Sequence, residues 1–170
     1  RPGVTGKSVL RNWGLVFLGN FAGALTTAFM VSFILTYGYA TDGGAVAAKV
    51  STIGESRTLG YQEHGLGGWI TIFIRGMLCN WMVSMGVVGA MISTSAGAKM
   101  AAMWMPVMLF FFMGFEHSIV NMFLFPFSMI MGGEFTVYDY LLWNEIPTVL
   151  GNLAGGLLFV GLPLYYTHVR

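Results

Sequence analysis

The sequence predicts an all-α polytopic membrane protein, and three observations support this fold class. Hydrophobic residues make up 56% of the chain and charged residues only 9%, with a mean hydropathy of +0.72. Soluble domains carry about a quarter charged residues. The chain also contains apolar runs of the length that a transmembrane helix needs, about 20 residues, and two of these runs share a short sequence pattern. We therefore expect residues 1–170 to form a single transmembrane domain of packed helices.

Four apolar segments define the expected helices. Residues 40–65, between the first two segments, contain charged side chains of both signs and are expected to form a polar loop. The third segment is too long for a straight helix, because a helix rises about 1.5 Å per residue and the hydrocarbon core is about 30 Å thick. Gly114 is the expected break in it, and Pro126 is a second irregularity. The expected helices cover about residues 12–39, 67–92, 100–131 and 146–166.

Polar side chains follow Gly114 inside the third apolar segment. Ionisable groups within a membrane are rare and usually face a bundle interior or a water-filled path, so Glu116 and His117 are candidate functional residues. A break at Gly114 would make them the first turn of a half-helix, where free N–H groups and the helix dipole favour an anion. On a continuous helix, Asn121 would lie one turn from His117 on the same face. The alternative is that His117 only forms a hydrogen bond with a neighbouring helix.

An internal repeat links the first and fourth segments. Residues 18–25 and 150–157 agree at six of eight positions, and the two segments are expected to cross the membrane in opposite directions. This pattern indicates an inverted repeat with a unit of three helices. We therefore expect two further apolar segments before Arg1. Close helix packing is the alternative explanation of the glycines, but it does not explain the shared Asn20 and Asn152.

Charge distribution predicts the orientation of the helices. Basic residues gather on one side of the expected membrane and acidic residues on the other, so the positive-inside rule places both ends of the chain in the cytoplasm of a cell (inner) membrane protein. The basic side carries Arg1, Lys7, Arg11, Lys99 and Arg170, whereas the other side carries Asp42, Glu55, Glu63, Glu134, Asp139 and Glu145 with only Lys49 and Arg57.

Arg75 is a further charge, inside the second apolar segment. Its guanidinium could attract an anion into the membrane. Alternatively, the long side chain could extend to the outer interface or meet a neighbouring subunit. We favour the second interpretation, because long cationic side chains commonly extend in this way.

Composition also excludes several classes of function. A net charge of +1 without a basic patch does not fit a nucleic-acid partner. The single cysteine, Cys79, cannot form an internal disulfide, and the sequence has no Cys/His cluster with metal-ligand spacing, so we predict neither a metal nor a cofactor. A haem-binding electron-transfer subunit is an alternative, but it would need paired deep histidines and only His117 is deep. An intramembrane hydrolase fits poorly, because adjacent Ser118 and His117 side chains diverge on a helix, and we predict no enzyme.

Four stretches resemble the formate/nitrite transporter family: residues 12–13 with 19–23, then 75–83, 114–123 and 151–156. They fall in all four expected helices, and the Phe-Glu-His-Ser sequence in the third stretch is highly specific. The resemblance implies an aquaporin-like helical bundle that assembles as a homopentamer. It also implies six helices and a pore in each protomer, with the second and fifth helices broken. This chain would then supply helices three to six.

The resemblance also implies roles for individual residues. His117 matches the family's central pore histidine, with Asn121 one turn beyond it. Asn80 and Val83 match residues at the pore and its inner constriction, and Phe110 matches a phenylalanine that narrows the pore. Val83 and Phe110 would equally pass as ordinary apolar core. His64 occupies the place where family members commonly carry a vestibule lysine, so the positive charge there would be titratable.

The function that these observations predict is transport of a small monovalent weak-acid anion, nitrite or formate, across the lipid bilayer. Moving such an anion into a narrow apolar pore is costly, and protonation removes most of that cost. His117 is the residue expected to aid protonation, since an imidazole titrates near neutral pH. Glu116 is expected to cap the half-helix or to hold the loop. A channel for another small solute, such as hydrosulfide, is an alternative.

Overall fold

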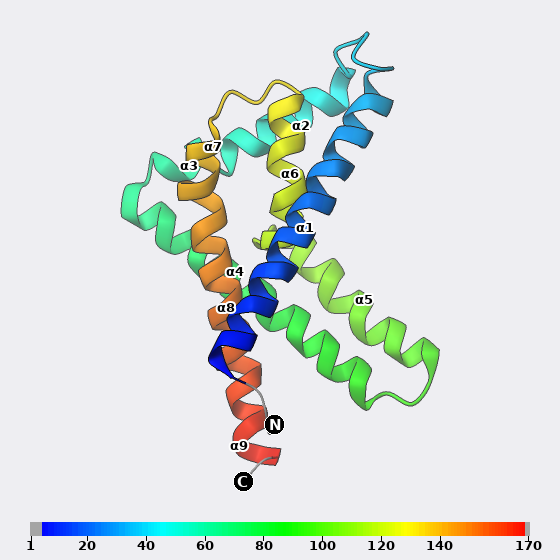
Figure 1. Ribbon diagram of the computed structural model, residues 1–170, viewed down its shortest axis with the longest axis vertical. Coiled ribbons are helices and arrows are strands. Elements are labelled where there is room, and N and C mark those ends of the chain that lie inside the picture. Colours follow the sequence, from blue (N-terminus) through cyan, green and yellow to red (C-terminus); the bar gives the residue numbers. More distant parts are fainter. Residues whose placement is uncertain (1–4, 169–170) are drawn as a thin grey trace. The chain divides into compact units, whose positions relative to one another are not determined.

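The computed structural model describes residues 5–168, and these residues form helices without any strand (Figure 1). Arg1 and Arg170, two of the basic residues used to predict the orientation, lie outside the described residues. The elements are α1 (Gly6–Leu35), α2 (Gly44–Ser56), α3 (Leu59–Gln62), α4 (Gly65–Ile92), α5 (Ala96–Phe112), α6 (Ser118–Ile130), α7 (Val137–Tyr140), η1 (Leu141–Glu145), α8 (Ile146–Gly156), η2 (Leu157–Gly161) and α9 (Leu162–His168), where η marks a π-helical turn.

Three helical stretches are long and apolar enough to cross a membrane: Gly6–Leu35, Gly65–Ile92 and Val137–His168. The last stretch is a continuous run of α-helix with two π-helical turns, and it begins before the expected residue 146. The third apolar segment is divided into α5 and α6, which are separated by residues 113–117. Residues 40–65 differ from the expected loop, because they contain α2 and α3.

The chain divides into two compact units, which are described separately. The first contains residues 5–55 and 119–135, that is α1, all but the last residue of α2 and all but the first residue of α6. Gly54 on α2 lies tightly against Ser128 on α6, because a Cβ at Gly54 would lie 2.1 Å from the Ser128 hydroxyl oxygen. The Glu55 carboxylate accepts a 2.9 Å hydrogen bond from the backbone N–H of Glu134. These contacts join α2 to α6 and to the residues that follow α6.

The second unit contains residues 56–118 and 136–168 and is built around the close packing of α4 and α8. Glycines allow the two backbones to touch. A Cβ at Gly151 would lie 2.2 Å from the Phe73 carbonyl oxygen, and one at Gly155 would lie 2.1 Å from the Met77 carbonyl oxygen. Small residues at such spacing are the usual means by which membrane helices approach closely. This packing brings the Gly-Asn sequence of α8 against the middle of α4.

The α4 helix continues into α5 through a short turn, and the two helices pack as a hairpin (Figure 1). Ser95 caps α5, because its side chain accepts a hydrogen bond from the Ala98 backbone N–H. Gly86 of α4 lies against α5, where a Cβ would be 3.2 Å from the Ala102 carbonyl oxygen. The hairpin thus carries the end of α5, and the residues that follow it, back toward the α4–α8 contact.

Candidate functional site

The interruption between α5 and α6 is the centre of the candidate site. Gly114 has a φ of +64°, a left-handed conformation that glycine adopts without the strain a side chain would bring. The chain then leaves the helix until Ser118, so Glu116 and His117 precede the half-helix, whereas we expected them in its first turn. Glu116 and Ser118 are buried, and His117 is half-buried between them.

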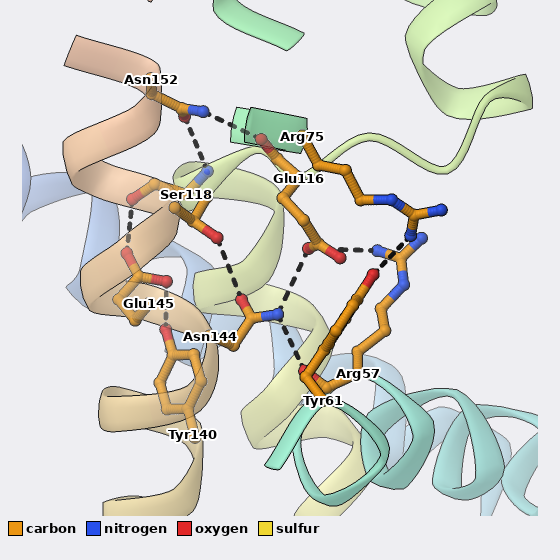
Figure 2. Close-up of polar contacts among 10 residues, drawn as sticks. Arg57, Tyr61, Arg75, Glu116, Ser118, Tyr140, Asn144, Glu145 and Asn152 are labelled. Carbon is orange, nitrogen blue, oxygen red and sulfur yellow. Dashed lines mark hydrogen bonds and ion pairs between the residues drawn. The ribbon is translucent and has the colours of Figure 1, made fainter. Parts of the chain in front are cut away.

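Asn152 on α8 holds the backbone on both sides of His117 (Figure 2). Its side-chain nitrogen donates to the carbonyl oxygens of Glu116, at 2.9 Å, and of Gly76, at 3.0 Å. Its side-chain oxygen accepts from the backbone N–H of Ser118, at 3.1 Å. Backbone groups at a helix start lack partners within the helix and need such bonds when they are buried. Asn152 therefore fixes the short non-helical segment that presents His117.

Asn80 on α4 contacts the backbone of Asn152 and so joins this arrangement. Its side-chain nitrogen donates to the carbonyl oxygen of Asn152. A Cβ at Gly156 would lie 2.6 Å from the same Asn80 nitrogen, so the glycine leaves the room that the amide occupies. Two of the asparagines expected at the site, Asn80 and Asn152, are thus in direct contact.

The buried carboxylate of Glu116 lies opposite a cation. Arg57, between α2 and α3, places its Nη1 atom 3.6 Å from the Glu116 Oε2 atom. The Asn144 side chain donates to the same carboxylate oxygen, at 3.3 Å, and to the Arg57 carbonyl oxygen, at 3.0 Å. Burying a carboxylate away from water costs free energy unless the carboxylate is paired with a cation and hydrogen-bonded. Asn144 and Arg57 supply both conditions (Figure 2).

Arg75 joins this group through Tyr61 on α3. The Arg75 guanidinium donates to the Tyr61 hydroxyl oxygen and lies 5.9 Å from the centre of its ring. Burial and the nearby Glu116 carboxylate raise the pKa of Tyr61, whereas Arg75 and Arg57 act to lower it. The phenol therefore keeps its proton at neutral pH. Its hydrogen bond orients Arg75 without cancelling the positive charge, while Arg57 is the arginine that pairs with Glu116.

Other residues suggested by the resemblance occupy several places. Phe110 is buried at the end of α5, and its ring stacks on that of His117, with centroids 5.7 Å apart and an interplanar angle of 20°. Val83 is half-buried on α4, and His64 is exposed directly before α4. In the other unit, Asn121 is fully buried on α6. Asn20 on α1 donates to the Val16 carbonyl oxygen of its own helix, unlike its repeat counterpart in α8.

Glu145 is a site residue that the sequence analysis used only among the acidic residues on one side of the expected membrane, and the structure buries it with 4% of its surface exposed. The Ser118 hydroxyl donates to its Oε1 atom, and the Tyr140 hydroxyl donates to its Oε2 atom at 2.9 Å. The π-helical turn at Leu141–Glu145 widens the helix by one residue, which lets both Asn144 and Glu145 point inward. The available signal was the seven-residue spacing between Glu145 and Asn152, two helical turns on one face.

The model of the formate/nitrite transporter family matches residues 2–166. The chain belongs to this family. It is 32% identical over 167 residues to a probable formate transporter of Methanothermobacter thermautotrophicus, and the match covers 95% of this chain and 60% of the relative. It is 30% identical to the formate channel FocA of Escherichia coli K12, a match that covers 98% of this chain and 62% of that one. This chain thus spans about 60% of the length of these relatives.

Solved structures agree with this assignment. A pentameric formate channel with formate bound superposes with a TM-score of 0.80 at 25% identity, over 99% of this chain and 70% of that chain. An ion channel of the same family superposes with a TM-score of 0.74 at 24% identity, over 96% of this chain and 61% of that chain. The all-helical fold is therefore that of the formate/nitrite transporter family, whose members are multi-pass membrane transporters and channels and not enzymes.

Proposed function

We propose that this protein carries a small monovalent weak-acid anion, formate or nitrite, across a cell membrane. The proposal rests on the hydrogen bonds of Asn152 to the residues on both sides of His117. These bonds lie at a helix interruption, and the chain is a member of a transporter family. Interrupted membrane helices commonly form substrate sites, because they supply backbone polar groups inside the bilayer. Formate as a substrate is also supported by the formate channel that the chain resembles.

His117 is proposed to aid protonation of the anion. A bare anion faces a large desolvation cost in a narrow apolar pore, and the neutral acid does not. Burial favours the neutral form of a weak acid, so an anion becomes easier to protonate as it moves inward. An imidazole ordinarily titrates near neutral pH and so is suited to exchange protons. The segment held by Asn152 would keep the His117 ring in place while it does so.

The remaining pathway residues divide by chemistry. Phe110 is proposed to narrow the path beside His117, since its ring already stacks on the imidazole. Val83 is proposed to form an inner apolar constriction. Asn80 and Asn121 would offer amide groups, and His64 would supply a titratable positive charge at the outer entrance. Arg57 and Arg75 add fixed positive charge near Glu116, which favours the approach of an anion.

The assembly is proposed to be a homopentamer with a path in each protomer, in the cell (inner) membrane. The pentameric formate channel that the chain resembles supports this assembly. Both described ends are proposed to face the cytoplasm, because Lys7 and Arg11 at one end and Lys99 in the first turn of α5 lie on the same predicted side.

Flux into liposomes tests the proposed function. The purified protein is reconstituted, and entry of labelled formate, nitrite and hydrosulfide is followed at a fixed anion gradient, with protein-free liposomes as the control. We expect formate or nitrite flux well above that of the control and a detergent-solubilised mass of five protomers. Equal flux in protein-containing and protein-free liposomes for both anions would refute transport of either. Faster entry of hydrosulfide than of both would refute the proposed substrate class.

A further inference from the structure

The buried carboxylate of Glu145 has a setting unlike that of Glu116. Glu116 faces Arg57 at 3.6 Å, whereas no ion pair within residues 5–168 is recorded for Glu145. Glu145 is nevertheless inside the helical stretch Val137–His168 and only 4% exposed. Ionisable residues inside a membrane are costly and usually functional. A role for Glu145 therefore has to be sought in its hydrogen bonds.

Both carboxylate oxygens accept from hydroxyl groups. Ser118 donates to Oε1 and Tyr140 donates to Oε2 (Figure 2). Bonds to a charged acceptor are about twice as strong as neutral ones. Tyr140 lies on the same helical stretch as Glu145, so its hydrogen bond is local to that stretch. Ser118 is the first residue of α6, so its hydrogen bond joins Glu145 to a different segment of the chain.

Ser118 is held at two points. Asn152 accepts from its backbone N–H at 3.1 Å, and Glu145 accepts from its hydroxyl. The carbonyl of Glu116, on the far side of His117, is also bound by Asn152, at 2.9 Å. Asn152 therefore anchors the backbone on both sides of His117, and Glu145 gives Ser118 a second anchor through its side chain. Loss of the Glu145 anchor would leave Ser118 free to rotate its side chain and would loosen the segment that presents the imidazole.

We propose that Glu145 is a positioning residue of the transport path, which acts on His117 by holding Ser118 at the head of α6. The proposal rests on the proposed function, because it treats His117 as the residue that meets the anion. Protonation of Glu145 would change this arrangement, because the proton occupies one carboxyl oxygen and the hydroxyl bonded to that oxygen, Ser118 at Oε1 or Tyr140 at Oε2, would then have to accept. Tyr140 is the titratable group beside Glu145 on its own helical stretch. The other titratable and charged groups that surround Glu145 lie at the interruption and on the packed elements α3 and α4: Glu116 with its partner Arg57, His117, Tyr61 and Arg75.

The test compares Glu145→Gln, Ser118→Ala and the double variant in liposome flux across a pH series. Each single variant should lower formate or nitrite flux at least about tenfold and shift its pH profile, as expected for loss of a charge-assisted hydrogen bond. The double variant should lose no more than the more severe single variant, because both changes break one contact. Glu134→Gln is the matched control: it makes the same change at an exposed carboxylate and should transport as wild type.

A second measurement separates this proposal from the proposed function. Nitrogen chemical shifts of the His117 ring, assigned with His117→Asn, should move in Glu145→Gln and in Ser118→Ala and stay unchanged in Glu134→Gln. This readout does not need transport, so it remains informative if the wild-type protein carries neither anion. If Glu145→Gln does not fold, Ser118→Ala carries the test alone. Wild-type ring shifts in the folded variants, or losses of flux that multiply in the double variant, would overturn the positioning role.

Discussion

Replacing Asn152 should loosen the segment that carries His117. Asn152→Ala removes three side-chain hydrogen bonds, to the Glu116 carbonyl, the Gly76 carbonyl and the Ser118 N–H. A typical hydrogen bond contributes about 1 kcal/mol net, so the loss is about 3 kcal/mol. That corresponds to roughly a hundredfold change in an equilibrium constant. Asn152→Asp keeps the acceptor for the Ser118 N–H but loses both donors and sets a carboxylate against two carbonyl oxygens, so it should be at least as damaging as the alanine variant.

The assay is thermal unfolding in detergent, followed by liposome flux. For a domain of this size, about 3 kcal/mol should lower the melting temperature by roughly 6–12 °C. Flux should fall by more than the loss of folded protein explains, because His117 would be displaced even in the molecules that stay folded. Asn12→Ala, at an exposed position of α1, is the control and should match wild type in both assays. A melting temperature and a flux for Asn152→Ala that equal those of wild type would refute the reasoning that Asn152 holds the interruption.

Three further predictions test other contacts. Arg57→Met should destabilise the protein by about 3 kcal/mol, because it leaves the Glu116 carboxylate buried without its cation, and adding Glu116→Gln should restore part of the loss in detergent unfolding. Gly151→Ala should fail to assemble in size-exclusion chromatography, since its Cβ would lie 2.2 Å from a carbonyl oxygen, whereas Gly67→Ala has open space and should assemble normally. His64→Lys, which fixes a positive charge at that position, should raise uptake at low anion concentration above that of His64→Gln, because positive charge attracts anions; equal uptake by the two variants would remove His64 from the mechanism.

Local features of the sequence predicted the helical fold and the interruption in its third apolar segment. Glycine followed by polar residues in an over-long apolar segment indicated an interruption at Gly114, where the structure leaves α5 and starts α6. The Gly-Asn pattern of the fourth segment drew attention to Asn152 through its resemblance to residues 18–25. These signals are local because they depend on backbone conformation and on the cost of polar groups in an apolar run.

Contacts between segments that are distant in the chain could not be predicted from local sequence. Glu145 was grouped with the acidic residues of one membrane side. Its seven-residue spacing from Asn152 places it on the same helix face, but the sequence does not predict the π-helical turn at Leu141–Glu145 or the contact with Ser118. Arg57 lies in a stretch interpreted as a polar loop, and its pairing with Glu116 spans 59 positions of the chain. Charge at the edge of an apolar segment fits a surface residue and a buried partner equally well. Only the packing of the elements that carry them decides between the two.

The most direct test of the account is the pH dependence of anion flux in His117→Asn. Asparagine keeps a hydrogen-bonding side chain but cannot titrate, so the variant should fold and assemble while its formate and nitrite flux loses the wild-type pH profile. His168→Asn, at the exposed end of α9, is the matched control and should keep that profile. Flux is measured in liposomes across a pH series, with oligomer size checked on the same samples. If His117→Asn carries both anions with the wild-type pH profile, His117 is a structural hydrogen-bonding residue and the proposed protonation step is wrong.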